Sequence, residues 1–170
     1  MTPKSNIKKC MAALIAAILL IAADQYTKIW AAKNLPAASK PLINGVLELK
    51  YFENTGAAFS MLQGKFTVFY IGTAIVLLLI IYAYIKIPAT KRYLPLRIDL
   101  IFLFAGAVGN LIDRARLHYV RDFIYFSLIN FPIFNVADIY VTCSAIALAL
   151  LLIFYYKDNE FEFIRPGSKK

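Results

Sequence analysis

The chain has 170 residues, 61% of them hydrophobic, and a formal net charge of +9. A soluble domain of this length could not bury so much apolar surface, so the composition excludes an ordinary soluble protein and favours a membrane protein. The charge does not indicate a nucleic-acid-binding protein, because the lysines and arginines gather beside apolar segments, as they do in membrane proteins.

Four apolar stretches are long enough to cross a bilayer, at about residues 10–30, 66–85, 94–112 and 134–156. A span needs about 20 residues at about 1.5 Å per residue, and each stretch is near that length. The first is not read as a removable signal peptide, because its apolar character resumes after Asp24 and a four-span topology requires it. We therefore expect an all-α membrane protein with four transmembrane helices, forming a single domain over residues 1–170.

The basic residues predict an orientation in the membrane. Most of the 19 lysines and arginines precede residues 10–30, connect 66–85 to 94–112, or follow 134–156. Positive charge favours the cytoplasmic side. The sequence thus predicts that both termini are cytoplasmic and that Asp24, Asp122 and Asp138 lie near the outer face.

The first outer connection, residues 33–65, is long enough to suggest a functional segment. Asn44-Gly45 is a hairpin turn signal, and apolar and charged residues alternate after it, which predicts a small β-hairpin or cradle on the membrane surface. Ala57 to Leu62 suits a short interfacial helix. A simple anchored loop is the alternative.

The third apolar stretch ends in small residues followed by Asn110 and Arg114. Small residues allow close helix contact, and positions four apart share a helical face. Either side chain taken alone is explained by helix–helix contact or by an arginine that reaches the interface.

Asp122 and Asp138 flank the short polar connection before the fourth stretch. Pro132 and Asn135 suit the start of a helix, which places Asp138 in its first turn, where the helix dipole favours the ionised form. If the two carboxyls converge, one stays protonated and the other ionised, as general acid–base hydrolysis requires. The alternative for each is an interfacial cap or a salt bridge with Arg121 or Arg114.

Five segments, in this order, resemble those of the lipoprotein signal peptidases, also called signal peptidase II. They are Asp24-Gln-Tyr-Thr-Lys28, Asn54-Thr-Gly-Ala-Ala-Phe59, Gly109-Asn-Leu-Ile-Asp-Arg114, Val120-Arg-Asp-Phe-Ile124 and Phe134-Asn-Val-Ala-Asp138. Each is weak alone, but five in order at plausible spacings form a specific pattern. The chain departs from the family at Ile139, where a small polar residue is common, and at Arg121, which could lower the pKa of Asp122.

The resemblance implies an aspartic endopeptidase of the bacterial inner membrane, without metal, cofactor or covalent intermediate, that cleaves prolipoproteins just before a diacylglyceryl-modified cysteine. It implies that Asp122 and Asp138 are catalytic and that the active site faces the periplasm. It also implies membrane phospholipid around the protein, a monomer, and inhibition by cyclic peptides of the globomycin type. Residues implied to bind substrate or support the site are Asp24, Lys28, Asn54, Gly56, Asn110, Arg114 and Asn135.

Three other readings stay open on the residues alone. The first is a different intramembrane aspartic peptidase. Its Gly-x-Gly-Asp motif is not found in this sequence, and Asp138 follows an alanine. A metallohydrolase could use His118, Asp122 and Asp138, if the third helix continues far enough to place the first two on one face. A small multi-pass proton or ion carrier would use the outer-face carboxylates to relay charge.

Overall fold

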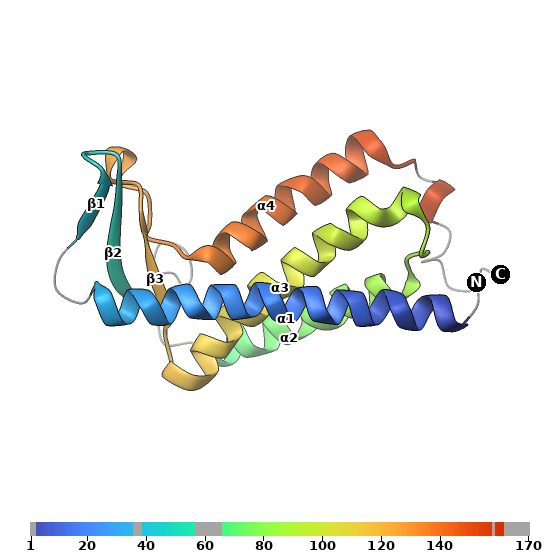
Figure 1. Ribbon diagram of the computed structural model, residues 1–170, viewed down its shortest axis with the longest axis horizontal. Coiled ribbons are helices and arrows are strands. Elements are labelled where there is room, and N and C mark those ends of the chain that lie inside the picture. The colour runs from blue at the N-terminus through green and yellow to red at the C-terminus, as the bar shows by residue number, and fades with distance from the viewer. Residues whose placement is uncertain (1–2, 36–38, 57–65, 158, 162–170) are drawn as a thin grey trace.

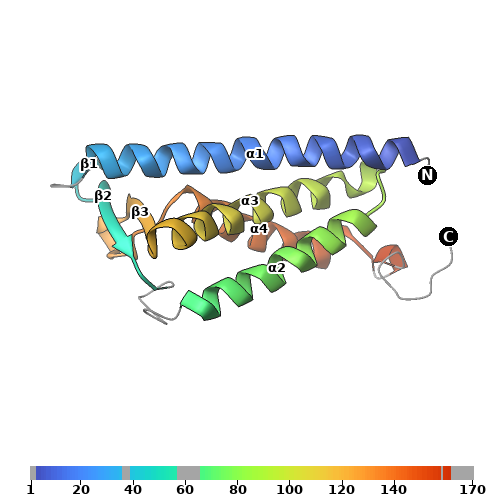
Figure 2. The ribbon, with the colours of Figure 1, turned by 90° about the horizontal axis from the view of Figure 1, so that it is seen from below.

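The computed structural model describes residues 3–35, 39–56, 66–157 and 159–161. In these segments, four α-helices follow the long axis of the molecule and a small sheet lies at one end (Figure 1). The helices are α1 (Pro3–Asn34), α2 (Phe66–Lys86), α3 (Leu94–Leu117) and α4 (Val136–Leu150), which continues in a π-helical turn, Leu151–Tyr155. The start of α1 and the end of α4 lie away from the sheet (Figure 2).

Within the described residues, three helices are long and apolar enough to cross a membrane: Thr67–Lys86, Lys91–Leu117 and Val136–Tyr155. The predicted stretches 66–85 and 134–156 agree closely with two of them, whereas α3 runs on past the predicted end at residue 112. Large apolar side chains such as Leu19, Leu79 and Ile153 are 61–68% exposed. Apolar exposure on this scale suits a protein surrounded by lipid.

The sheet has three antiparallel strands in the order β1-β2-β3: β1 (Lys40–Ile43), β2 (Leu47–Asn54) and β3 (Val120–Tyr125). Strands β1 and β2 form the predicted hairpin, and its turn contains Gly45 at φ +70°, a conformation that favours glycine. The third strand was not predicted. It pairs with β2 from Glu48 to Asn54, and Phe52 stands opposite Asp122.

The interfacial helix predicted from Ala57 to Leu62 lies outside the described residues. The structure describes the preceding segment up to Gly56, which is buried.

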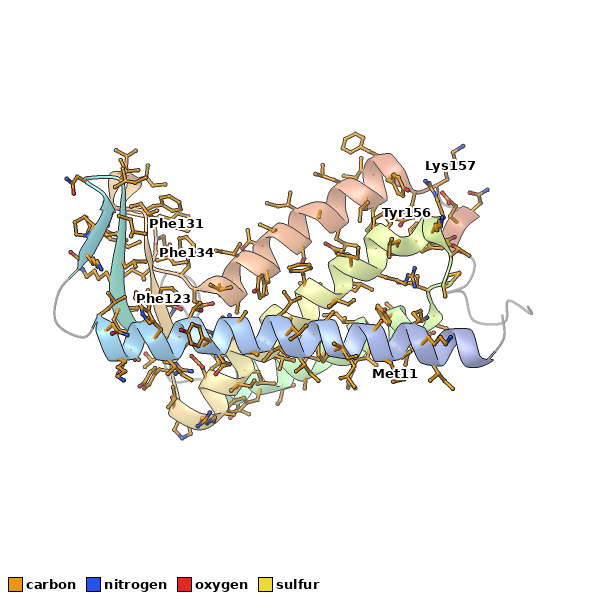
Figure 3. All side chains as sticks on the ribbon, viewed as in Figure 1. Met11, Phe123, Phe131, Phe134, Tyr156 and Lys157 are labelled. Atoms are coloured by element: carbon orange, nitrogen blue, oxygen red, sulfur yellow. The ribbon has the colours of Figure 1, made fainter. Side chains whose placement is uncertain are left out.

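Small residues bring α1, α3 and α4 into close contact near the sheet. A Cβ atom at Gly106 would lie 2.6 Å from the backbone oxygen of Ala137, and one at Gly109 would lie 2.5 Å from Oδ2 of Asp24. The predicted close packing at the end of the third stretch is confirmed, because nothing larger than hydrogen fits at these two positions. Figure 3 places Phe123, Phe131 and Phe134 at this end and Tyr156 and Lys157 at the other.

Candidate functional site

Two carboxyl groups from different elements meet through one asparagine. Asp122 lies on β3 and Asp138 lies in the first turn of α4. The side-chain Nδ2 of Asn135 donates a hydrogen bond to Oδ1 of Asp122 at 2.6 Å, and its backbone N–H donates to Oδ2 of Asp138 at 3.1 Å. The two aspartates singled out in the sequence are therefore brought together, each bonded to Asn135.

Asp122 is only 2% exposed. Its second oxygen, Oδ2, accepts a hydrogen bond from Nδ2 of Asn54 at 2.9 Å. Burial, and then the charge of Asp138, raise the pKa of Asp122 to about 7, although the hydrogen bonds from Asn54 and Asn135 act in the opposite direction. Asp122 can therefore hold a proton near neutral pH.

Asp138 is fixed by the start of α4. Oδ1 of Asn135 accepts from the backbone N–H of Asp138 at 3.0 Å, and Asp138 accepts from the backbone of Asn135, which makes a reciprocal capping box. The predicted helix start, with Asp138 in its first turn, is confirmed. Nδ2 of Asn110 donates to Oδ1 of Asp138 at 2.7 Å, so this carboxyl receives two N–H donors at a helix N-terminus.

A buried lysine orients Asn110. Nζ of Lys28 donates to Oδ1 of Asn110 at 2.8 Å and pairs with Oδ2 of Asp24 at 3.0 Å. Because Oδ1 of Asn110 faces an ammonium group, its Nδ2 is left facing Asp138. Oδ1 of Asp24 accepts from the backbone N–H of Ala137 at 2.9 Å, so this aspartate also holds the start of α4.

The sequence analysis did not identify a second group of polar residues as part of the site, two of them buried and one, Gln25, half-buried. Asp113 is fully buried, and Arg121 donates to it from Nη2 at 2.6 Å, from Nε at 3.0 Å and from its backbone N–H at 3.0 Å. Gln25 donates to Asp113 at 3.2 Å and accepts from Arg121 at 3.1 Å. All three belong to the motifs quoted above, but no spacing rule indicates that they contact one another.

Arg121 does not act on Asp122 as its sequence position suggested. Its guanidinium is held by Asp113 and Gln25, and the pKa of Asp122 is raised rather than lowered. Neighbouring residues of a strand point to opposite faces, which separates the two side chains. Among the described residues, the salt bridges of Asp122 or Asp138 with Arg121 or Arg114 that the sequence allowed do not form.

Arg114 joins α3 to the outer connection. Its Nη2 donates to the backbone oxygen of Gly56 at 3.2 Å, and its guanidinium lies 4.6 Å from the centre of the Phe69 ring. The backbone N–H of Gly56 donates to Oδ1 of Asn54 at 2.9 Å. This bond orients the amide of Asn54 so that its Nδ2 faces Asp122.

A cavity of about 680 Å³ opens beside the two aspartates, at the sheet end of the molecule. Its polar wall includes Asn54, Asn110, Arg114, Asp122 and Asp138, and its apolar wall includes Phe52, Val120, Ile133, Phe134 and Ile139. Asp24, Lys28 and Asn135 lie behind this wall, fully buried. The cavity can therefore admit an apolar ligand that carries a polar backbone to the carboxyl pair.

His118 does not share a helical face with Asp122, because α3 ends at Leu117 and His118 follows it in the left-handed conformation, at φ 63°. It is exposed and is not part of the cavity wall. Over the described part of the chain, no three histidine, cysteine, aspartate or glutamate side chains are grouped so that they could hold a metal ion.

Residues 16–154 match the family model described as signal peptidase (SPase) II. The chain is 44% identical, over 144 residues, to the lipoprotein signal peptidase of Caldanaerobacter subterraneus subsp. tengcongensis, covering 84% of this chain and 96% of that protein. It is 43% identical over 139 residues to the lipoprotein signal peptidase of Enterococcus faecalis, covering 81% and 82%. A bacterial membrane enzyme solved by the in meso method at 2.3 Å resolution has a TM-score of 0.74 and 34% identity, covering 83% of this chain and 87% of that one.

Proposed function

Because the chain belongs to the signal peptidase II family, we propose that Asp122 and Asp138 are the catalytic pair of an aspartic endopeptidase. The enzyme removes the signal peptide from prolipoproteins, and we place the cut just before the diacylglyceryl-modified cysteine. One observation supports the catalytic proposal: Asn135 donates to both carboxyls at the edge of a cavity, so two carboxyl groups lie close together where a peptide can enter, as acid–base hydrolysis requires.

The two carboxyls differ in the way that an acid–base pair requires. Asp122, with its pKa raised to about 7, can hold a proton near neutral pH and suits the acid. Asp138 accepts hydrogen bonds from Asn110 and from the backbone of Asn135 at a helix N-terminus. Because these donors stabilise the charged form of the carboxyl group, we assign Asp138 as the base.

In the first step Asp138 takes a proton from a water molecule, whose oxygen attacks the scissile carbonyl carbon, while Asp122 gives its proton to the carbonyl oxygen. In the second step the tetrahedral intermediate collapses, and the proton on Asp138 passes to the leaving amine of the lipidated cysteine. The new carboxylic acid belongs to the released signal peptide, and Asp122 takes back the proton of the hydroxyl that becomes its carbonyl. No covalent enzyme intermediate forms.

The remaining predicted site residues divide into two roles. We assign substrate binding to Asn54, Gly56 and Arg114. Asn54 and Arg114 line the cavity, and Arg114 holds the backbone of Gly56 beside it. We assign support to Asp24, Lys28, Asn110 and Asn135, because the hydrogen bonds of these residues lead to Asp138 or to the start of its helix.

For the topology, we propose that α1 also crosses the membrane, which gives four spans in a single domain. Helix α1 has 32 residues and therefore a length of about 48 Å, more than the roughly 30 Å hydrocarbon core. The clustering of lysine and arginine favours cytoplasmic termini, so the cavity at the sheet end would face the periplasmic side of the bacterial inner membrane.

The proposed substrate delivers its own scissile bond to this site. Each buried CH₂ of a diacylglyceryl group contributes about 0.8 kcal/mol to membrane binding, so the lipidated cysteine is held at the interface, where we place the carboxyl pair. We propose that the protein acts as a monomer surrounded by phospholipid, and that cyclic peptides of the globomycin type compete for the cavity. Membership of a peptidase family does not favour the ion-carrier alternative.

The test is a gel-shift cleavage assay with purified protein in detergent, using one prolipoprotein with and without its diacylglyceryl group. We expect the wild type to cleave only the lipidated form, and Asp122→Asn and Asp138→Asn each to lose at least about 10²-fold in rate while remaining folded. Thr142→Ser, a conservative change in the cavity wall, is the control for nonspecific damage. Robust turnover by either aspartate variant would remove the two-carboxyl mechanism.

A further inference from the structure

A second hollow, a groove of about 950 Å³, lies between α3 and α4 inside the candidate spans. Its walls are mostly apolar and include Ile98, Phe102, Ala147, Leu150 and Leu151. Ile139 and Cys143 line both this groove and the cavity beside the carboxyl pair. The groove therefore continues from the candidate active site towards the end of the molecule away from the sheet.

Asp99 is the one charged residue in the wall of this groove. The residue is only 6% exposed, and within the described residues its Oδ2 has no hydrogen-bond partner. Across the groove, Oγ of Ser144 donates a hydrogen bond to the backbone oxygen of Asp99 at 3.3 Å. A buried carboxyl oxygen without a donor is costly, so a donor from a bound molecule would satisfy it.

Nearby basic side chains do not meet this need. Arg97 is not part of the groove wall, and its Nη2 donates to the backbone oxygen of Thr90 at 3.2 Å. Arg92 pairs with Glu160 at 2.7 Å. An apolar groove with one unsatisfied acceptor fits an apolar helix that carries a cationic group at one end.

On the basis of the proposed function, we propose that this groove binds the apolar helix of the signal peptide and that Asp99 accepts hydrogen bonds from a lysine or arginine of its basic N-terminal region. Signal peptides place such a region before an apolar segment of about 7–15 residues. As a helix, that segment is about 10–22 Å long.

The dimensions of the groove match that length. Asn110, beside the carboxyl pair, and Asp99 lie on the same helix, about 16 Å apart at about 1.5 Å per residue. A signal peptide whose cleaved end reaches Asp138 therefore brings its basic region level with Asp99. Asp99 then selects substrates by charge, at a distance from the scissile bond.

The test uses the full-length protein in detergent and two diacylglyceryl-modified prolipoproteins that differ only in having lysine or glutamine in the N-terminal region. The readout is the ratio of kcat/KM for the lysine form to that for the glutamine form. A hydrogen-bonded charge pair gives an expected preference of about tenfold in the wild type. We expect Asp99→Asn to lower that ratio to less than about twofold and Asp99→Glu to retain most of it.

A second pair of variants tests the groove itself. Ala147 lines the groove, so Ala147→Phe should fill it and raise KM for both substrates at least about fivefold. Ala145 is exposed on the same helix and outside the groove wall, so Ala145→Phe should leave both kinetic constants unchanged.

Equal cleavage of the two substrates by the wild type would overturn the role of Asp99 without use of any variant. If Ala147→Phe behaved like Ala145→Phe, the groove would hold a lipid chain or a second copy of the protein instead, and the proposal would fail. A wild type that cleaves neither substrate would overturn the proposed function itself, an outcome distinct from a lost charge preference.

Discussion

Arg121 binds Asp113 and not Asp122, its neighbour in the chain. Two guanidinium nitrogens and the backbone N–H of Arg121 all donate to the carboxyl group of Asp113, at 2.6–3.0 Å. This contact fixes the start of β3 against the end of α3. It therefore sets where the next residue, Asp122, stands relative to α4.

We predict that Asp113→Asn will lower both stability and activity. The substitution leaves the guanidinium of Arg121 buried without its counter-charge, and breaking one partner of a buried ion pair costs about 3–5 kcal/mol. The free energy of unfolding in detergent would measure the loss. The matched control is Glu160→Gln, which breaks the partly exposed pair with Arg92 and should change stability much less. Equal effects of the two substitutions would contradict the structural role of Asp113.

The pKa of Asp122 predicts the alkaline side of the pH–rate profile. Asp122, as the acid, must be protonated, so the activity of the enzyme should fall as the pH rises through about 7. The hydrogen bond from Asn54 lowers this pKa, so Asn54→Ala should move the alkaline limb to higher pH while also weakening substrate binding. If the alkaline limb did not move in Asn54→Ala, that limb would report the pKa of a group other than Asp122.

Arg121 gives a control for the same profile. Because its guanidinium is held by Asp113 and Gln25, Arg121→Met should reduce activity through misplacement of β3 without moving either limb. A shift of either limb would restore a direct electrostatic role for this arginine.

The local features of the fold could be predicted from the sequence, and the long-range ones could not. Apolar runs gave the positions of α2 and α4, Asn44-Gly45 gave the hairpin turn, and Asn135 gave the start of α4. Strand β3 was missed because the strand with which it pairs, β2, lies 66 residues or more earlier in the chain. Its pairing depends on how α1 and α3 place the two segments.

The same reason separates the site residues that could be predicted from those that could not. Asp122, Asp138 and the asparagines around them stand in motifs whose residue types suggest acid–base chemistry, and they do lie together. The contacts of Asp113 with Gln25 and Arg121 join α1, α3 and β3, so they exist only in the folded protein. The bond from the backbone of Ala137 to Asp24 has no sequence signal at all, because every residue except proline carries the donor.

The raised pKa of Asp122 also has a cost in stability, which its replacement should reveal. In the unfolded chain this carboxyl ionises near its ordinary pKa of 3.8, whereas in the folded protein it stays protonated up to about pH 7. The unfolded state therefore binds fewer protons than the folded state between these values, and the contribution of Asp122 to stability falls as the pH rises through this window. Thermal unfolding should show the Tm of Asp122→Asn rising relative to that of the wild type between pH 4 and pH 7. A constant difference in Tm over this range would contradict the raised pKa.

Gly109 offers a test of the close contact between α1, α3 and α4 that holds the site. A methyl group at this position would lie 2.5 Å from Oδ2 of Asp24 and 3.3 Å from Cβ of Ala137, and Asp24 is held in place by Lys28. We predict that Gly109→Ala will cost about 1–3 kcal/mol and lower activity more than tenfold, because α3 must move away from the start of α4. Gly72→Ala is the matched control: it is also a helical glycine, but its added Cβ would meet nothing within 4 Å, so stability should change by less than about 1 kcal/mol. If the two variants unfolded at the same temperature and cleaved substrate at the same rate, the packing at Gly109 would not be what positions Asp138.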